Sequence, residues 1–126
     1  MAVSRRGSGP KVQPEHFDAH RADKVRQLIS IYGVHGLAAL VGVSPSQPVR
    51  WRQGREGLSE PATRQLLGLE YLTSRLAEVF TARQAQAWLS SPNPYLAGST
   101  PAQVFAQLGA AAVEPAISAV EIGAAV

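Results

Sequence analysis

The residues of this chain with the clearest capacity for chemistry are its histidines, two of which have the spacing of metal ligands. His16 and His20 are four residues apart, which places both rings on one face of a helix. No third ligand or carboxylate pattern completes such a site, so we predict no bound metal. The sequence also offers no Gly-rich phosphate loop, no serine in an elbow motif and no paired acids with a shared pocket. We therefore predict that the protein is not an enzyme and uses no cofactor.

The distribution of charge points to binding instead. Residues 1–64 contain ten Lys and Arg against five Asp and Glu, a net charge of +5, whereas residues 65–126 contain two against four, a net charge of −2. A basic front half and a mildly acidic back half suit a protein that contacts a polyanion at one end and another protein at the other. A solvated surface with no binding role is the alternative.

Composition sets the outer limits. The 126 residues suffice for one small domain with a modest core. The chain has no cysteine, which excludes disulfides and fits a cytoplasmic protein. No apolar stretch follows the early arginines, so we expect no secretory signal. The apolar stretch 110–126 is short and is interrupted by Glu114, Pro115 and Glu121, so we expect no membrane span.

The chain is predicted to begin with a flexible basic tail over residues 1–20, because this stretch is rich in Ser, Gly, Pro and charge and lacks periodic apolar positions. The next segment, 21–32, has apolar residues on one face of an amphipathic helix. These residues are Val25, Leu28, Ile29 and Tyr32. Gly33 is expected to end this helix.

Residues 36–54 have the sequence form of a helix-turn-helix. Ala38 suits the inner side of a short first helix, Gly42 permits a tight turn, and Ser44 is a candidate N-cap for the second helix. The segment resembles the Xre-type helix-turn-helix, whose second helix lies in the major groove in the members that bind DNA. The resemblance implies base-facing residues at 44–46, 49 and 50, with Arg50 placed for a bidentate contact to guanine. The DNA-binding residues that we predict are Ser44, Ser46, Gln47, Arg50, Arg52 and Arg55.

Pro48 departs from this pattern, because a proline in a helix interior costs about 3 kcal/mol. The cost disappears if Ser46 caps the helix and Pro48 lies in its first turn. Two hypotheses therefore stay open: the segment reads DNA, or it is a structural relic of a motif that did. Trp51, at the far end of this helix, is predicted to be a core residue.

The longest predicted helix spans 61–80, capped by Ser59 or Glu60. Its apolar residues follow a 3.6-residue period, which predicts a core helix or a helix shared in a homodimer. They are Leu66, Leu67, Leu69, Leu72, Leu76, Val79 and Phe80.

The last third of the chain alternates helix starts and stops. Thr81 and Gln84 form a capping box that predicts a helix from Ala82, with Trp88 and Leu89 on its inner side. The prolines of Pro92-Asn93-Pro94 end that helix, and Tyr95 and Leu96 after them are expected to pack inward. A second helix begins at Thr100-Pro101 and ends at Gly109.

A final helix is predicted from Val113, Ala116, Ile117 and Val120, which recur at one-face spacing after Pro115. A helix of about ten residues is marginal alone in water. It must therefore dock on its own domain or on a partner.

Together, Trp88-Leu89, Pro92-Asn93-Pro94, Leu96, Gly98, Thr100-Pro101, Gly109 and the terminal apolar helix resemble the toxin-binding domain of Xre/MbcA/ParS-type antitoxins. The resemblance implies that the terminal region lies against a RES-domain toxin, which consumes NAD or uses it to modify proteins, and hinders access to the toxin's active site. The toxin-binding residues that it implies are Trp88, Leu96, Gly98, Pro101, Val120, Ile122 and Val126.

The sequence thus predicts an all-α protein, a small helical bundle. We expect a flexible tail (1–20), a helix-turn-helix-like region (21–60), and a long helix followed by a toxin-binding subdomain (61–126). The predicted function is that of an antitoxin in the cytoplasm, forming a homodimer or a hetero-oligomer with its toxin, with operator DNA as a further partner. The alternative is a stand-alone helix-turn-helix repressor that dimerises through its C-terminal helices.

Overall fold

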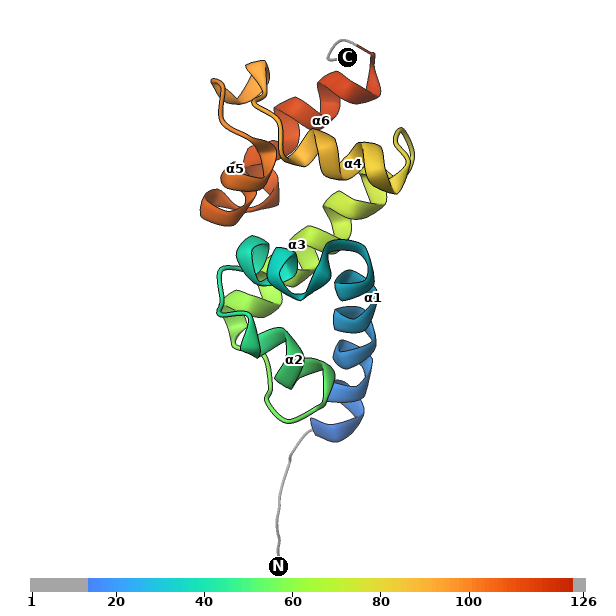
Figure 1. Ribbon diagram of the computed structural model, residues 1–126, viewed down its shortest axis with the longest axis vertical. Helices are drawn as coiled ribbons and strands as arrows, with labels where there is room; N and C mark the ends of the chain where they lie inside the picture. Colours follow the sequence, from blue (N-terminus) through green and yellow to red (C-terminus); the bar gives the residue numbers. More distant parts are fainter. Residues whose placement is uncertain (1–13, 124–126) are drawn as a thin grey trace, which may run out of the picture.

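The computed structural model describes residues 14–123, with side chains from Arg21 onward, and this part of the chain is entirely helical. This confirms the predicted all-α fold. The α-helices are α1 (Pro14–Val41), α2 (Ser46–Arg52), α3 (Glu60–Leu76), α4 (Ala82–Leu89), α5 (Pro101–Leu108) and α6 (Glu114–Glu121), with short 3₁₀ helices η1 (Pro94–Leu96) and η2 (Ala110–Val113). Figure 1 shows α1 and α2 around the first part of α3, and α4, α5 and α6 around its last part.

Helix α1 is broken at Gly33, as the sequence predicts. Gly33 has φ 78°, a left-handed conformation that glycine adopts without the penalty of a side chain. The break leaves carbonyl groups just before it without a helical hydrogen bond. Gln86 of α4 donates to one of these groups, the Ile31 oxygen, at 2.6 Å. The predicted start of this helix at Arg21 is wrong, because α1 begins at Pro14. The remainder of the predicted tail, residues 1–13, lies outside the described residues.

Polar side chains attach α1 to α3 along their length. The Tyr32 hydroxyl lies 2.6 Å from the Thr73 hydroxyl, and Lys24 forms an ion pair with Glu70. Burial raises the pKa of Tyr32, so its hydroxyl stays protonated and available as a donor. Val25 and Leu28 of α1 are buried on the same side. The apolar stripe predicted for this helix therefore faces α3.

The core is centred on α3. Ser59 caps the helix, accepting a hydrogen bond from the Ala62 N–H at 3.2 Å. The stripe of Leu66, Leu69, Leu72 and Leu76 is buried, and each such side chain contributes roughly 1.5–3 kcal/mol by leaving water. Two of the predictions for this helix are wrong. Leu67 was predicted to lie in the apolar stripe but is 58% exposed, and the helix ends at Leu76 instead of Phe80.

One side chain of α3 joins both parts of the molecule. Gln65 donates from Nε2 to the Leu40 oxygen of α1 and to the Phe105 oxygen of α5, both at 3.1 Å. The Leu40 carbonyl lies near the C-terminal end of α1, where helical partners run out, and the Phe105 carbonyl also accepts the Gly109 N–H at 2.8 Å. One turn along α3, Gly68 has no side chain at a point where an added Cβ would lie 3.3 Å from the Ala110 Cβ. The C-terminal helices therefore approach α3 closely at Gly68.

Among the described residues, no single helix is long and apolar enough to cross a membrane. The segment Arg21–Val41 reaches that length and hydropathy only together with α2, and the two are bent by 118° at the break between them.

Candidate functional site

A groove of about 500 Å³ opens in the C-terminal part of the molecule, between the end of α3, α4, the loop after α4 and the end of α6. Its apolar lining residues come from all four of these segments. We call this feature the apolar groove, and its apolar side chains are Val79, Phe80, Trp88, Pro92, Pro94 and Val120.

Helix α4 forms one wall of the apolar groove. Its start is fixed by the predicted capping box, in which the Thr81 N–H donates to Gln84 Oε1 at 2.9 Å and the Gln84 N–H donates to Thr81 Oγ1 at 3.2 Å. Leu89 is buried, and the half-buried Trp88 packs against Phe80 with ring centroids 6.3 Å apart and planes tilted by 44°. Trp88 Nε1 is buried without a hydrogen-bond partner. The exposed part of this ring is therefore its apolar part.

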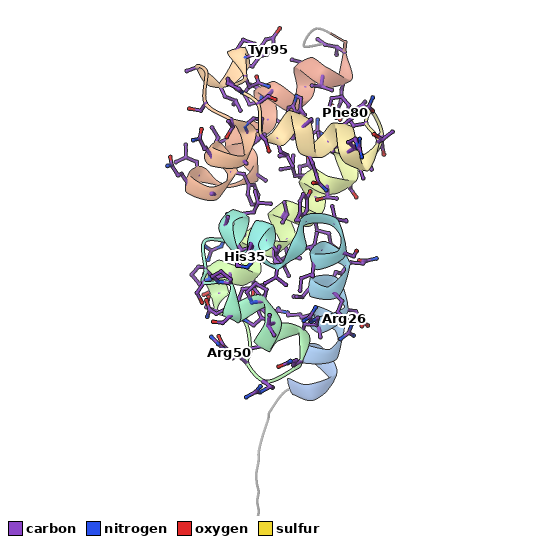
Figure 2. All side chains as sticks on the ribbon, viewed as in Figure 1. Arg26, His35, Arg50, Phe80 and Tyr95 are labelled. Atoms are coloured by element: carbon purple, nitrogen blue, oxygen red, sulfur yellow. The ribbon has the colours of Figure 1, made fainter. Side chains whose placement is uncertain are left out.

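The loop after α4 is closed on itself by Asn93. The buried Asn93 accepts at Oδ1 from the Tyr95 N–H (2.9 Å) and at its main-chain oxygen from the N–H groups of Leu96 (3.0 Å) and Gly98 (2.9 Å). The loop turns through Ala97 at φ 56° and Gly98 at φ 87°. Its tight closure directs Tyr95 outward (Figure 2). This residue is 45% exposed. The prediction that Tyr95 packs inward is therefore wrong, while Leu96 is half-buried.

Helix α5 follows this loop directly. A second capping box, formed by Thr100 and Gln103, starts the helix, and Gly109 at φ 90° follows its end, as predicted. Pro101 in its first turn is fully buried. Of the predicted toxin-binding residues, Pro101 therefore shapes the surface only indirectly.

Helix α6 closes the other side of the apolar groove. Its inner face is buried at Val113, Ala116 and Ile117, whereas Val120 is half-buried in the groove and Ile122 is 80% exposed just beyond the helix. The predicted periodicity is confirmed, but part of the apolar surface of this segment is not buried. Val126 lies outside the described residues.

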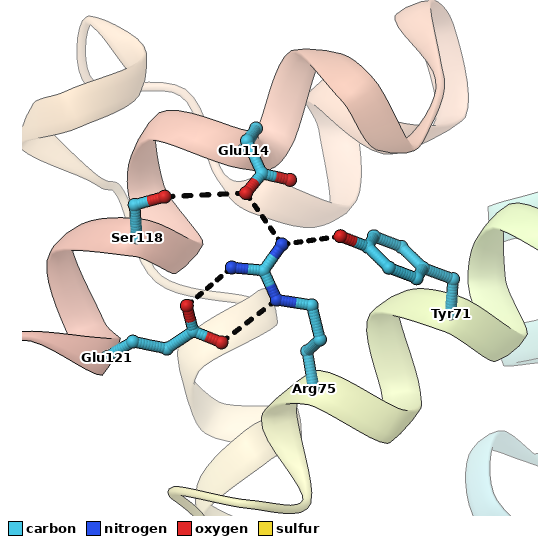
Figure 3. Close-up of polar contacts among 5 residues, drawn as sticks. All are labelled: Tyr71, Arg75, Glu114, Ser118 and Glu121. Atoms are coloured by element: carbon cyan, nitrogen blue, oxygen red, sulfur yellow. Dashed lines mark hydrogen bonds and ion pairs between the residues drawn. The ribbon is translucent and has the colours of Figure 1, made fainter.

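Arg75 of α3 holds α6 in place, as Figure 3 shows. Its guanidinium donates from Nε and Nη2 to the two carboxylate oxygens of Glu121, at 2.9 and 2.5 Å, and from Nη1 to Glu114 at 2.6 Å. Nη1 also donates to the Tyr71 hydroxyl at 2.6 Å. The hydrogen bonds to Glu121 and Glu114 raise the pKa of Arg75, and the bond from Arg75 lowers the pKa of Glu121. A fork of this kind is the strongest geometry that an arginine and a carboxylate can form.

The predicted DNA-binding residues lie around α2, which follows a turn at Gly42 with φ 85°. Pro48 is in the first turn, as predicted, but the expected serine cap is wrong. The N-cap residue is Pro45, and no side chain caps the helix, because the hydroxyls of Ser44 and Ser46 lie 3.1 Å from each other. Trp51 is buried, which confirms its assignment to the core.

Glu56 pairs with two of the predicted DNA-binding side chains. Arg50 forms an ion pair with Glu56, and Gln47 donates from Nε2 to the same carboxylate at 2.8 Å. These hydrogen bonds, that of Arg50 first, lower the pKa of Glu56. Arg55 donates only to Gln53, at 3.3 Å. The surface thus offers the hydroxyls of Ser44 and Ser46 and the cations of Arg52 and Arg55, with Arg50 partly neutralised.

The histidine pair suggested by the sequence falls at the start of α1, and the side chains of His16 and His20 lie outside those described. Within the described part of the chain, no three His, Asp or Glu side chains gather in a way that would hold a metal ion.

The C-terminal helices that form the apolar groove are similar to a known domain. Residues 75–123 match the family model of the antitoxin Xre/MbcA/ParS C-terminal toxin-binding domain, which confirms the resemblance predicted from the sequence. The chain is also similar to a chain in the crystal structure of the M. tuberculosis MbcT–MbcA toxin–antitoxin complex, with a TM-score of 0.69 and 28% identity over 82% of this chain and 95% of that chain. No curated protein matches it.

Sequence reasoning missed part of the groove. Val79 and Phe80 were assigned to the inner stripe of the long helix, whereas they follow α3 and line the groove. Pro92 and Pro94 are predicted as helix stops and as part of the resemblance to the toxin-binding domain, but not as lining of a groove. The proline-rich connector that follows Trp88 in the sequence is the pattern that indicates an apolar surface here.

Proposed function

We propose that this chain is an antitoxin that binds its cognate toxin through the apolar groove and the residues after α6. The observation that carries the proposal is the exposure of Ile122 and of the groove inside the very segment, 75–123, that matches a toxin-binding domain. Covering an exposed isoleucine contributes roughly 1.5–3 kcal/mol to association. The other groove side chains add to this through their exposed parts.

Each predicted toxin-binding residue then has a distinct role. Trp88 and Val120 form the groove, and Ile122 projects beside it as the most exposed apolar side chain. Leu96 and Gly98 shape the neighbouring loop, and the buried Pro101 supports that loop. Val126 would continue the contact beyond Ile122.

The nature of the toxin follows from the family resemblance. That resemblance implies a RES-domain toxin that consumes NAD, with the terminal region of the antitoxin occluding the toxin's active site in the cytoplasm. Such a complex would contain more than one antitoxin chain if α3 pairs with a second copy. Leu67 and Tyr71, one turn apart and 58% and 48% exposed, are available for that pairing. We propose 21–60 and 61–126 as the two units of the fold, with α3 common to both and with α1 extending back to Pro14 into the predicted tail.

Co-expression with the product of the adjacent gene tests the antitoxin proposal. We expect a stable complex and loss of toxicity. Deleting residues 120–126 is expected to impair neutralisation far more than any DNA binding. Full neutralisation by the truncated chain would contradict the role given to the terminal segment, and the absence of any complex would contradict the antitoxin role itself.

A second function, DNA binding by α2, is favoured by the turn at Gly42 and by the exposure of Ser44 and Ser46, whose hydroxyls bond only to each other among the described residues. Operator binding would let an antitoxin regulate its own transcription. A stand-alone repressor, the alternative, would bind DNA without any toxin partner. Titration of labelled upstream DNA at several salt concentrations separates these cases, because phosphate contacts give a steep dependence on salt.

A further inference from the structure

The residues of α6 stabilise the last turn of this helix only weakly. The helix has eight residues, Glu114–Glu121, and a helix this short does not persist alone in water. Its last residue is an acid, and a carboxylate at a helix C-terminus lies at the negative end of the helix dipole. Ile122 follows directly and is 80% exposed. The position of Ile122 therefore depends on what holds Glu121.

Arg75 supplies that hold from another helix. Its side chain is only 20% exposed and makes a two-bond fork with Glu121 and a third bond to Glu114. Ser118 completes the arrangement by donating to Glu114 at 3.4 Å. The two acids lie one on the first and one on the last turn of α6, so one guanidinium fixes both ends of the helix (Figure 3).

The same arginine lies close in sequence to the opposite wall of the apolar groove. Val79 and Phe80 follow Arg75 by four and five residues, and Val120 immediately precedes Glu121. The fork therefore connects the segment that carries Val79 and Phe80 to the segment that carries Val120 and Ile122. A small rotation of α6 would change the width of the groove and the direction of Ile122.

We propose that Arg75 is a positioning residue for partner binding, which sets the placement of Val120 and Ile122 relative to Val79 and Phe80 through its fork with Glu121 and Glu114. Arg75 need not touch the partner itself. The contribution to binding rests on the proposed antitoxin function, whereas the placement of α6 is a property of the free chain. A purely structural ion pair would add a little stability and leave the binding surface unchanged.

The decisive variants are Arg75→Lys, which keeps the charge but loses the fork, and Arg75→Gln, which loses both. Lys24→Gln is the matched control, because Lys24 and Glu70 form an interhelical ion pair between α1 and α3 whose side chains are 34% and 33% exposed. Amide hydrogen exchange over 114–122 reports on the placement of α6 in the free chain. Calorimetric titration with the purified product of the adjacent gene reports on binding.

We expect Arg75→Gln to increase exchange over 114–122 and to weaken binding by about tenfold or more, a loss equal to one strong polar contact. Lys24→Gln should change neither the exchange over 114–122 nor the binding. Lys24→Gln and Arg75→Gln should both lower the melting temperature by a similar small amount. Arg75→Lys should fall between them. The double variant Arg75→Glu, Glu121→Arg should recover part of the protection and of the binding that Arg75→Glu loses.

Wild-type exchange over 114–122 in Arg75→Gln would overturn the proposal, and so would undiminished binding by that variant. If the wild-type chain binds no toxin, the proposed function fails, and the exchange data still decide whether Arg75 places α6. The two failures are therefore distinguishable.

Discussion

Arg50 is paired with Glu56 across the turn that ends α2, and Gln47 donates to the same carboxylate. One acid thus pairs with two of the predicted DNA-binding side chains. On the proposal that α2 binds DNA, the pairing opposes that binding, because it neutralises the charge of Arg50 and holds a carboxylate beside it.

Glu56→Gln is therefore expected to strengthen DNA binding several-fold, since it removes the ion pair and one negative charge. Fluorescence anisotropy with labelled upstream DNA measures this. Glu60→Gln is the matched control, because it makes the same charge change at an exposed residue in the first turn of α3. If Glu56→Gln binds DNA no better than Glu60→Gln, α2 does not read DNA through Arg50.

Ile122→Asp is expected to weaken toxin binding by about tenfold or more without lowering the melting temperature, because Ile122 is 80% exposed and contributes little to the core. Leu108→Asp introduces the same charge at a residue that is 71% exposed at the end of α5, outside the apolar groove. Titration calorimetry and thermal unfolding of both variants check the prediction. Equal losses of binding would mean that added charge, and not the position of Ile122, is responsible.

Leu69→Ala is expected to lower the free energy of unfolding by about 2–5 kcal/mol, because it opens a cavity in a fully buried part of α3. Leu67→Ala makes the same change two residues away, where the side chain is 58% exposed, and is expected to cost well under about 1 kcal/mol. Urea unfolding measures both. A large loss in Leu67→Ala would indicate that this face is covered in solution, as a pairing of two α3 helices requires.

The docking of α6 is expected to weaken in acid. The bond from Arg75 lowers the pKa of Glu121 below its ordinary value of 4.5, so this carboxylate stabilises the folded chain above that pH, and the contribution is lost as the pH falls through the lower folded value. The raised pKa of Arg75 keeps the guanidinium charged throughout. The protection factors of the amides over 114–122, which correct for the intrinsic slowing of exchange in acid, should therefore fall below about pH 4.5 in the wild type.

Glu121→Gln provides the comparison, because its side chain does not titrate. Its protection factors over 114–122 should be lower than those of the wild type at neutral pH and should depend less on pH. Identical pH profiles for the two proteins would assign the acid sensitivity to other groups, among which Glu56 also has a lowered pKa.

Local sequence patterns predicted several helix ends, because caps and turns depend on neighbouring residues. The capping box at Thr81, the N-cap at Thr100 and the break at Gly33 lie where the sequence places them. The start of α1, the end of α3 and the cap of α2 do not. The stripe of α3 was predicted except at Leu67, since periodicity identifies one face but not its edges. Tyr95 was misplaced because its direction depends on bonds that Asn93 makes within a closed loop.

Contacts between distant segments could not be predicted from local patterns. The fork from Arg75 to Glu121 joins residues 46 apart, and nothing in the spacing of either helix indicates it. The capture of Arg50 by Glu56 spans only six residues, yet it depends on how the loop after α2 turns back. The composition of the apolar groove was predicted only in part for the same reason, because its walls come from four segments.

The two hydrogen bonds from Gln65 to the carbonyl groups of Leu40 and Phe105 limit where this molecule can be divided. A fragment starting at residue 75 would match the domain boundary seen in the comparison, yet it would leave out Gln65 and the face of α3 against which Phe105 lies. Engineered chimaeras that graft the proposed toxin-binding segment onto another protein should therefore begin no later than Ser59, so that they include the whole of α3 together with the C-terminal helices.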